Sequence, residues 1–156
     1  MRRGGVLVGA LALVAIGSAA LSPSREPNPR SDPAAALGVK TPVPTPVMST
    51  LRRACFDCHS NETRWPWYAS LPIASWLIER DVKAGRGQFN FSRWTEYNPF
   101  DRASLLVKIC EMATGHAMPP QRYRLLHADA RLSEADVSEL CAWTRLEAIR
   151  LVGGGS

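Results

Sequence analysis

Cys55-Phe56-Asp57-Cys58-His59 is the stretch of sequence on which the interpretation of the whole chain depends. Two cysteines separated by two residues and followed at once by a histidine are the attachment signature of a c-type haem. One helical turn brings Cys55 and Cys58 to the same side, where each thiol can add to one vinyl group of the porphyrin. The motif therefore predicts one covalent haem c, bound through Cys55 and Cys58, with His59 as the proximal iron ligand.

Other kinds of Cys-x-x-Cys site find less support in the sequence. A structural zinc site needs a second, closely spaced pair of ligands, whereas the remaining cysteines, Cys110 and Cys141, are single and far apart. A thioredoxin-like redox pair needs a βαβ surrounding, and no alternating strand pattern is present. Cys110 and Cys141 fall on apolar faces of predicted helices, and both a disulfide between them and two buried thiols fit that pattern.

Met118 is the expected distal ligand of the iron. It stands in His116-Ala117-Met118-Pro119-Pro120, between the end of a predicted helix and two prolines that limit the freedom of the loop. A thioether is a soft ligand, and His/Met ligation raises the reduction potential of a haem. His116 is the alternative distal ligand, and His/His ligation would lower the potential.

Aromatic and basic residues near the motif predict the rest of the haem site. Trp65, Trp67 and Trp94 are expected to wall the haem, and an indole N–H can also donate a hydrogen bond to a propionate. Arg64 is the expected charge partner of a propionate.

Periodicity and charge define the class of the protein. Apolar residues recur at helical spacing over residues 101–114 and 133–151, which predicts an all-α, cytochrome-c-like domain wrapped around one haem. The formal net charge is +5, from 19 Lys and Arg against 14 Asp and Glu. Because no basic cluster is longer than a pair, we expect no nucleic-acid partner.

The N-terminal part of the chain predicts export. Arg2 and Arg3 precede an uncharged apolar run over residues 6–21. We therefore interpret residues 1–21 as a signal peptide or an N-terminal membrane anchor, through which the protein could associate with the membrane. Either interpretation places the domain in the periplasm, free or anchored to the cytoplasmic membrane.

The remaining boundaries follow from composition. Residues 22–47 contain seven prolines and are expected to be an extended linker. Residues 48–152 form the predicted haem-binding domain, and residues 153–156 a flexible tail.

Several blocks of sequence together resemble the small bacterial haem-binding domain proteins related to class I cytochromes c. They keep the family's order from Arg53 to Trp143. The blocks are Cys55 to Tyr68, Ser75-Trp76-Leu77, Phe91-Ser92-Arg93-Trp94, Met118-Pro119-Pro120, Leu125-Leu126-His127 and Leu132-Ser133. The resemblance implies a monohaem c-type domain on the outer side of the cytoplasmic membrane, with Cys55 and Cys58 as attachment points, His59 as proximal ligand and Met118 as distal ligand.

The function expected from these features is one-electron transfer with a transient redox protein partner, rather than catalysis. Two alternatives stay open. One is a haem enzyme or a gas or peroxide sensor in which the distal ligand is displaced. The other is an accessory haem subunit of a membrane redox complex.

Overall fold

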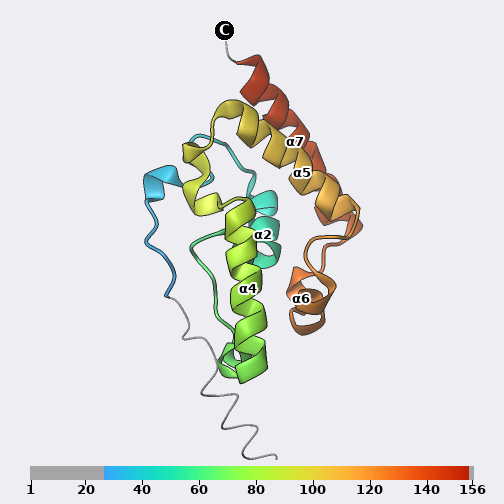
Figure 1. The fold of residues 1–156 in the computed structure, drawn as a ribbon. Helices are drawn as coiled ribbons and strands as arrows, with labels where there is room; N and C mark the ends of the chain where they lie inside the picture. Colours follow the sequence, from blue (N-terminus) through green and yellow to red (C-terminus); the bar gives the residue numbers. More distant parts are fainter. Residues whose placement is uncertain (1–26, 155–156) are drawn as a thin grey trace, which may run out of the picture.

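The computed structural model describes residues 27–154 as helices joined by loops, with no β-strand among them (Figure 1). This confirms the prediction of an all-α domain. With η denoting a 3-10 helix, the elements in chain order are η1 (Pro33–Ala35), α2 (Thr45–Ala54), α3 (Phe56–His59), η2 (Trp67–Ser70), α4 (Pro72–Gln88), η3 (Phe91–Glu96), α5 (Pro99–Thr114), α6 (Gln121–Leu126), η4 (Ala128–Ala130) and α7 (Glu134–Gly153).

The long helices α5 and α7 pack along each other and form the scaffold of the domain (Figure 1). Their contact buries Leu106 and Leu140 almost completely. A disulfide between Cys110 and Cys141 joins the two helices, which decides between the two alternatives that the sequence left open. The chain between these cysteines contains Met118 and α6, so the disulfide closes a loop around the predicted distal half of the site.

Helix α2 leads the chain into the attachment motif predicted at Cys55 to His59. It buries Val47, Leu51 and Ala54 against the core. Its C-terminal end is fixed to α7, because the Arg53 guanidinium forms an ion pair of 2.5 Å with Asp136. At Cys55 the backbone leaves helical geometry (φ −126°, ψ −38°), and α3 starts in a new direction.

The structure of residues 33–47 differs from the extended linker that the sequence predicted there. Leu37 and Thr41 are buried, and the Leu37 N–H donates to the Phe91 carbonyl over 2.8 Å. The indoles of Trp94 and Trp143 donate to Thr41 Oγ1 and to the Pro42 carbonyl. The segment includes η1 and the first turn of α2, each with a proline in its first turn. Buried apolar contacts and two indole hydrogen bonds hold the chain between these helices on the domain.

No helix within residues 27–154 is long and apolar enough to cross a membrane. The predicted signal peptide or anchor, residues 1–21, lies outside the described residues, as does the end of the predicted tail at residues 155–156.

Candidate functional site

A cavity of about 280 Å³ lies between α3, α4, α5 and the loop that leads into α6. Cys55, Cys58, His59 and Met118 all line it. Most of the remaining wall is apolar. Its larger members are Phe89, Phe91, Leu105, Ile109, Met112 and Leu140.

Local hydrogen bonds hold the attachment motif as a single helical turn. The His59 N–H donates to the Cys55 carbonyl over 2.9 Å, and the Cys58 N–H donates to the same carbonyl over 3.2 Å. Side chains that follow the motif close the turn from outside. The Ser60 hydroxyl donates to the Phe56 carbonyl over 2.8 Å and the Thr63 hydroxyl to the Asp57 carbonyl over 2.7 Å. The two cysteines are therefore presented together to one cavity.

Burial keeps both of these cysteines protonated. It raises the pKa of Cys55 to about 12, with a further contribution from Cys58. It also raises the pKa of Cys58 to about 11, assisted by the nearby carboxylates of Asp81 and Asp57. At neutral pH both groups are thiols rather than thiolates.

His59 is buried beside the two thiols. Its ring stacks on Phe89, with 4.1 Å between centroids and an interplanar angle of 15°. Burial lowers the pKa of His59, and backbone groups of Phe89 and Gly85 oppose this shift. The ring is therefore held in the neutral form that a metal ion binds. Its Nδ1 is buried and makes no hydrogen bond of good geometry with the described residues.

The distal loop brings Met118, and not His116, to the cavity. The Met118 N–H donates to the Met112 carbonyl over 3.1 Å, which folds the loop back onto the end of α5. Met118 lines the cavity with 38 % of its surface exposed. His116 adopts a left-handed backbone (φ 54°), lies exposed and does not line the cavity.

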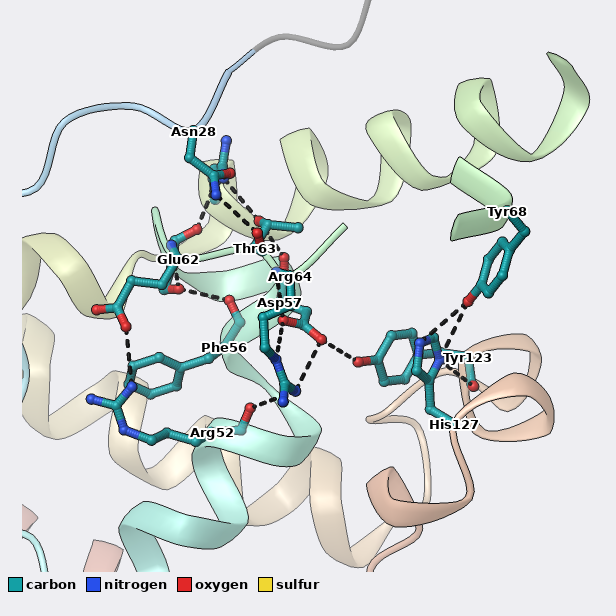
Figure 2. A network of polar contacts seen from close by, with 12 residues as sticks. Asn28, Arg52, Phe56, Asp57, Glu62, Thr63, Arg64, Tyr68, Tyr123 and His127 are labelled. Atoms are coloured by element: carbon teal, nitrogen blue, oxygen red, sulfur yellow. Dashed lines mark hydrogen bonds and ion pairs between the residues drawn. The ribbon is translucent and has the colours of Figure 1, made fainter. Parts of the chain in front are cut away.

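Arg64, the expected propionate partner, is engaged with the attachment motif itself (Figure 2). Its backbone N–H donates to Asp57 Oδ1 over 3.0 Å, and its guanidinium donates to both carboxylate oxygens over 3.2 Å. Asp57 is buried, so this charge needs partners inside the protein. Arg64 was predicted to pair with a propionate because it follows the motif closely in sequence. In the structure its guanidinium pairs with the Asp57 carboxylate instead.

Tyr123 completes the partners of Asp57 and faces the cavity. Its hydroxyl donates to Asp57 Oδ2 over 2.7 Å, and its ring stacks on His127 with 4.0 Å between centroids (Figure 2). Burial and the hydrogen bond to Asp57 raise the pKa of Tyr123 above the usual value for tyrosine. His127 in turn lies 3.3 Å from the Tyr68 hydroxyl. This network connects α3, α6 and η2.

The three tryptophans that were predicted to wall the haem do not line the cavity. Trp65, Trp67 and Trp94 are all absent from the lining of the cavity. Trp67 is 80 % exposed, Trp65 is half-buried, and Trp94 is fully buried in the core behind Phe91. The aromatic wall comes instead from Phe89 and Phe91, which shortly precede Trp94 in the sequence.

Sequence reasoning missed the charged groups that line the cavity. Arg122 of α6 donates to both carboxylate oxygens of Asp81 in α4, over 2.7 and 2.8 Å, and Lys108 of α5 lies on the same lining. Asp81 and Arg122 are distant in sequence and carry no motif, so only the fold reveals their pairing. Residues 27–154 hold no group of three or more His, Cys, Asp or Glu side chains suited to a metal ion.

The residues of the cavity fit a haem. Its wall is apolar, its two thiols lie one helical turn apart, and a buried imidazole held in the neutral form and a thioether line the same space. An imidazole and a thioether are ligands that haem iron accepts. Cys55 and Cys58 would hold the porphyrin, and His59 and Met118 the iron.

Comparison with known proteins agrees with this chemistry. The sequence is 32 % identical over 101 residues to cytochrome c peroxidase Ccp of Escherichia coli (strain K12). The match covers 62 % of this chain but only 22 % of that protein. No solved structure matches the chain. The profile of the family described as "Haem-binding domain" matches residues 13–146, and the chain therefore belongs to the haem-binding domain family.

Proposed function

We propose that this protein is a monohaem c-type cytochrome that transfers single electrons outside the cytoplasmic membrane. The observation that carries the proposal is that Cys55, Cys58, His59 and Met118 line one apolar cavity. A bound haem supplies the ferrous/ferric couple. The protein supplies the attachment, the two axial ligands and a surrounding that excludes water from most of the site.

Each residue of this set has a defined task. The thiols of Cys55 and Cys58 would hold the porphyrin by adding across its vinyl double bonds, the sulfur to one carbon and the hydrogen to the other. His59, held between Phe89 and the backbone near Gly85, would be one iron ligand. Met118 would be the other ligand and would raise the potential. Two protein ligands would favour electron transfer over reaction with O₂ or peroxide.

The location and the partner form part of the same proposal. The apolar run over residues 6–21 supports export of the chain, with the domain free in the periplasm or anchored to the membrane. Exchange with a redox protein would use a small, transient interface, as is usual for such encounters.

Expression together with the haem c maturation machinery tests the attachment. We expect a red protein whose haem stays with the chain on a denaturing gel and does not extract into acidic acetone. Cys55→Ser with Cys58→Ser should abolish this retention. The matched control is Cys110→Ser with Cys141→Ser, which removes two cysteines that do not line the cavity and should leave the haem attached. Haem that extracts from the unmodified protein would refute covalent binding.

A second candidate function, a peroxidase, has two observations in its favour. One is the partial similarity to cytochrome c peroxidase, and the other is the exposure of Met118, which would ease its displacement from the iron. Carbon monoxide distinguishes the two functions. A closed carrier resists carbon monoxide in the ferrous state and shows no turnover with peroxide, whereas rapid carbon monoxide binding with peroxide turnover would establish the enzyme.

A further inference from the structure

Four large apolar side chains are exposed where η2 leads into α4. Trp67 is 80 % exposed, Ile73 75 %, Trp76 61 % and Leu71 49 %. We call these four residues the apolar tip. Single exposed apolar residues are common on soluble proteins, but a cluster of this kind marks a surface that is covered by something else.

The exposed face of α4 changes from apolar to basic along the helix. Ile73, Trp76, Arg80 and Lys83 are all exposed, and their spacing of three and four residues places them on one side of α4. Tryptophan is enriched at the boundary between lipid and water, and nearby basic side chains are attracted to anionic headgroups. The order of residues along this face therefore matches the order of layers at a membrane surface.

The start of the described chain is held beside the basic end of this face of α4. The Asn28 amide donates to the Thr63 carbonyl over 2.9 Å (Figure 2). Arg86 of α4 donates to the Asn28 side-chain oxygen over 2.9 Å. Trp67 follows Thr63 by four residues and thus lies within about 14 Å of it. Figure 1 shows residues 27–32, before η1, on the side toward the end of the domain where α4 begins, away from the C-terminal end of α7.

The length of the preceding chain then limits how far the domain can stand from a membrane. The apolar run ends at Leu21, seven residues before Asn28. Those residues span at most about 25 Å when fully extended. If residues 6–21 are held in a bilayer, the segment at Asn28 and Thr63 stays near its surface, within reach of the apolar tip.

We propose that the apolar tip docks on the surface of a phospholipid bilayer that contains anionic lipids, with Arg80 and Lys83 beside the headgroups. The inference rests on the location given in the proposed function. Docking would fix the orientation of the domain on the membrane, so that its redox partner meets the same face of the cytochrome in every encounter.

Hydroxyl-radical footprinting of the full chain, residues 1–21 retained, tests the proposal in vesicles of phosphatidylethanolamine and phosphatidylglycerol. Phe100 and Ile149 serve as internal references, because they are 71 % and 67 % exposed and lie near the start of α5 and the end of α7. After correction for intrinsic reactivity, we expect Trp67, Ile73 and Trp76 to be modified roughly threefold less than these references, since lipid shields them from water.

Variants make the footprint specific to the apolar tip. Trp67→Ser with Trp76→Ser should restore the modification of Ile73, whereas the matched change Phe100→Ser should leave it protected. Equal modification of the apolar tip and the references would overturn the proposal. Protection that disappears as the protein is diluted with excess lipid would also overturn it, because a second copy of the chain would then be the occupant. Haem retention is measured separately, so failure of the footprint with haem still attached refutes only the docking.

Discussion

Gly85 of α4 lies directly against the backbone of Cys58, and a Cβ atom at residue 85 would be 2.6 Å from the Cys58 carbonyl oxygen. Real Cβ atoms do not approach a carbonyl oxygen so closely. The absence of a side chain at this one position is therefore what lets α4 pack against the attachment turn. The contact also places backbone groups of α4 beside the ring of His59.

Gly85→Ala should consequently damage the site. The added methyl group must push α4 away from α3, and overpacking of this kind costs about 1–3 kcal/mol of the free energy of unfolding. We expect a lower denaturation midpoint and a smaller fraction of chains with attached haem. Gly87→Ala is the matched control in the same helix, because a Cβ there meets no atom within 4 Å. It should be neutral or stabilising by roughly 0.5–1 kcal/mol. Equal effects of the two substitutions would contradict the packing argument.

The distal ligand is tested by three single substitutions. Met118→Ala should remove the weak long-wavelength absorption band of a methionine–iron bond in the ferric protein and lower the reduction potential. His116→Ala should change neither property, because His116 does not line the cavity. Met112→Ala controls for the loss of a second methionine from the lining and should keep the band. Loss of the band in the Met112 variant alone would transfer the ligand role to α5.

The hydrogen bond from Tyr123 to Asp57 should contribute measurably to stability. Tyr123→Phe keeps the ring that stacks on His127 and removes only the donor to a buried carboxylate. Because hydrogen bonds to charged groups contribute about 1.5–3 kcal/mol, we expect a loss of that order in the free energy of unfolding. Tyr68→Phe is the control, since its hydroxyl approaches only His127, at a partly exposed position. It should cost clearly less. Chemical denaturation of the holoprotein measures both.

The lowered pKa of Asp136 makes the stability of the protein depend on pH. Burial raises its pKa, but hydrogen bonds from Ser133, Arg53 and Thr50 outweigh burial and hold the pKa well below the usual range. A carboxyl group with a depressed folded-state pKa stabilises the protein above its ordinary pKa, about 3.9, and loses this contribution as the pH falls through the folded-state value.

Asp136→Asn should therefore destabilise the protein at neutral pH by about 2 kcal/mol, because it weakens the capping box with Ser133 and removes the charge-assisted hydrogen bonds of the carboxylate. The difference from the wild type should shrink as the pH falls below about 4. Glu134→Gln is the matched control, an exposed acid in the same first turn of α7. A difference that stays constant down to low pH would contradict the assignment of this group.

Local signals in the sequence predicted those parts of the fold that local chemistry determines. Helical spacing over residues 101–114 and 133–151 predicts two helices, and the structure has α5 ending at Thr114 and α7 beginning behind a capping box of Ser133 and Asp136. Two glycines close together, such as Gly85 and Gly87, are typical of a helix end, but α4 continues to Gln88. The continuation has a tertiary cause, because α4 packs on Cys58 at Gly85, and the pattern of residues in α4 alone does not contain that contact.

For the site, too, the sequence predicted some parts correctly and others not. The spacing of Cys55, Cys58 and His59 predicts that they share one helical turn, and the structure brings this turn and Met118 to the same cavity. Its role as ligand stays a prediction. The tryptophans could not be assigned from sequence, because a large aromatic side chain serves equally as cavity wall, as core or as exposed surface. Trp94 and Trp67 occupy the last two of these environments.

The disulfide between α5 and α7 has a consequence for the biogenesis of the protein. The chain carries four cysteines, of which Cys110 and Cys141 form the disulfide and Cys55 and Cys58 are free thiols. The fold separates the two pairs, because the disulfide joins α5 to α7 and the free thiols line the cavity. Docking of α5 on α7 would bring Cys110 and Cys141 together and leave Cys55 and Cys58 reduced for the covalent attachment that we propose. The bridge would then sort the thiols as well as reinforce the packing of the two helices.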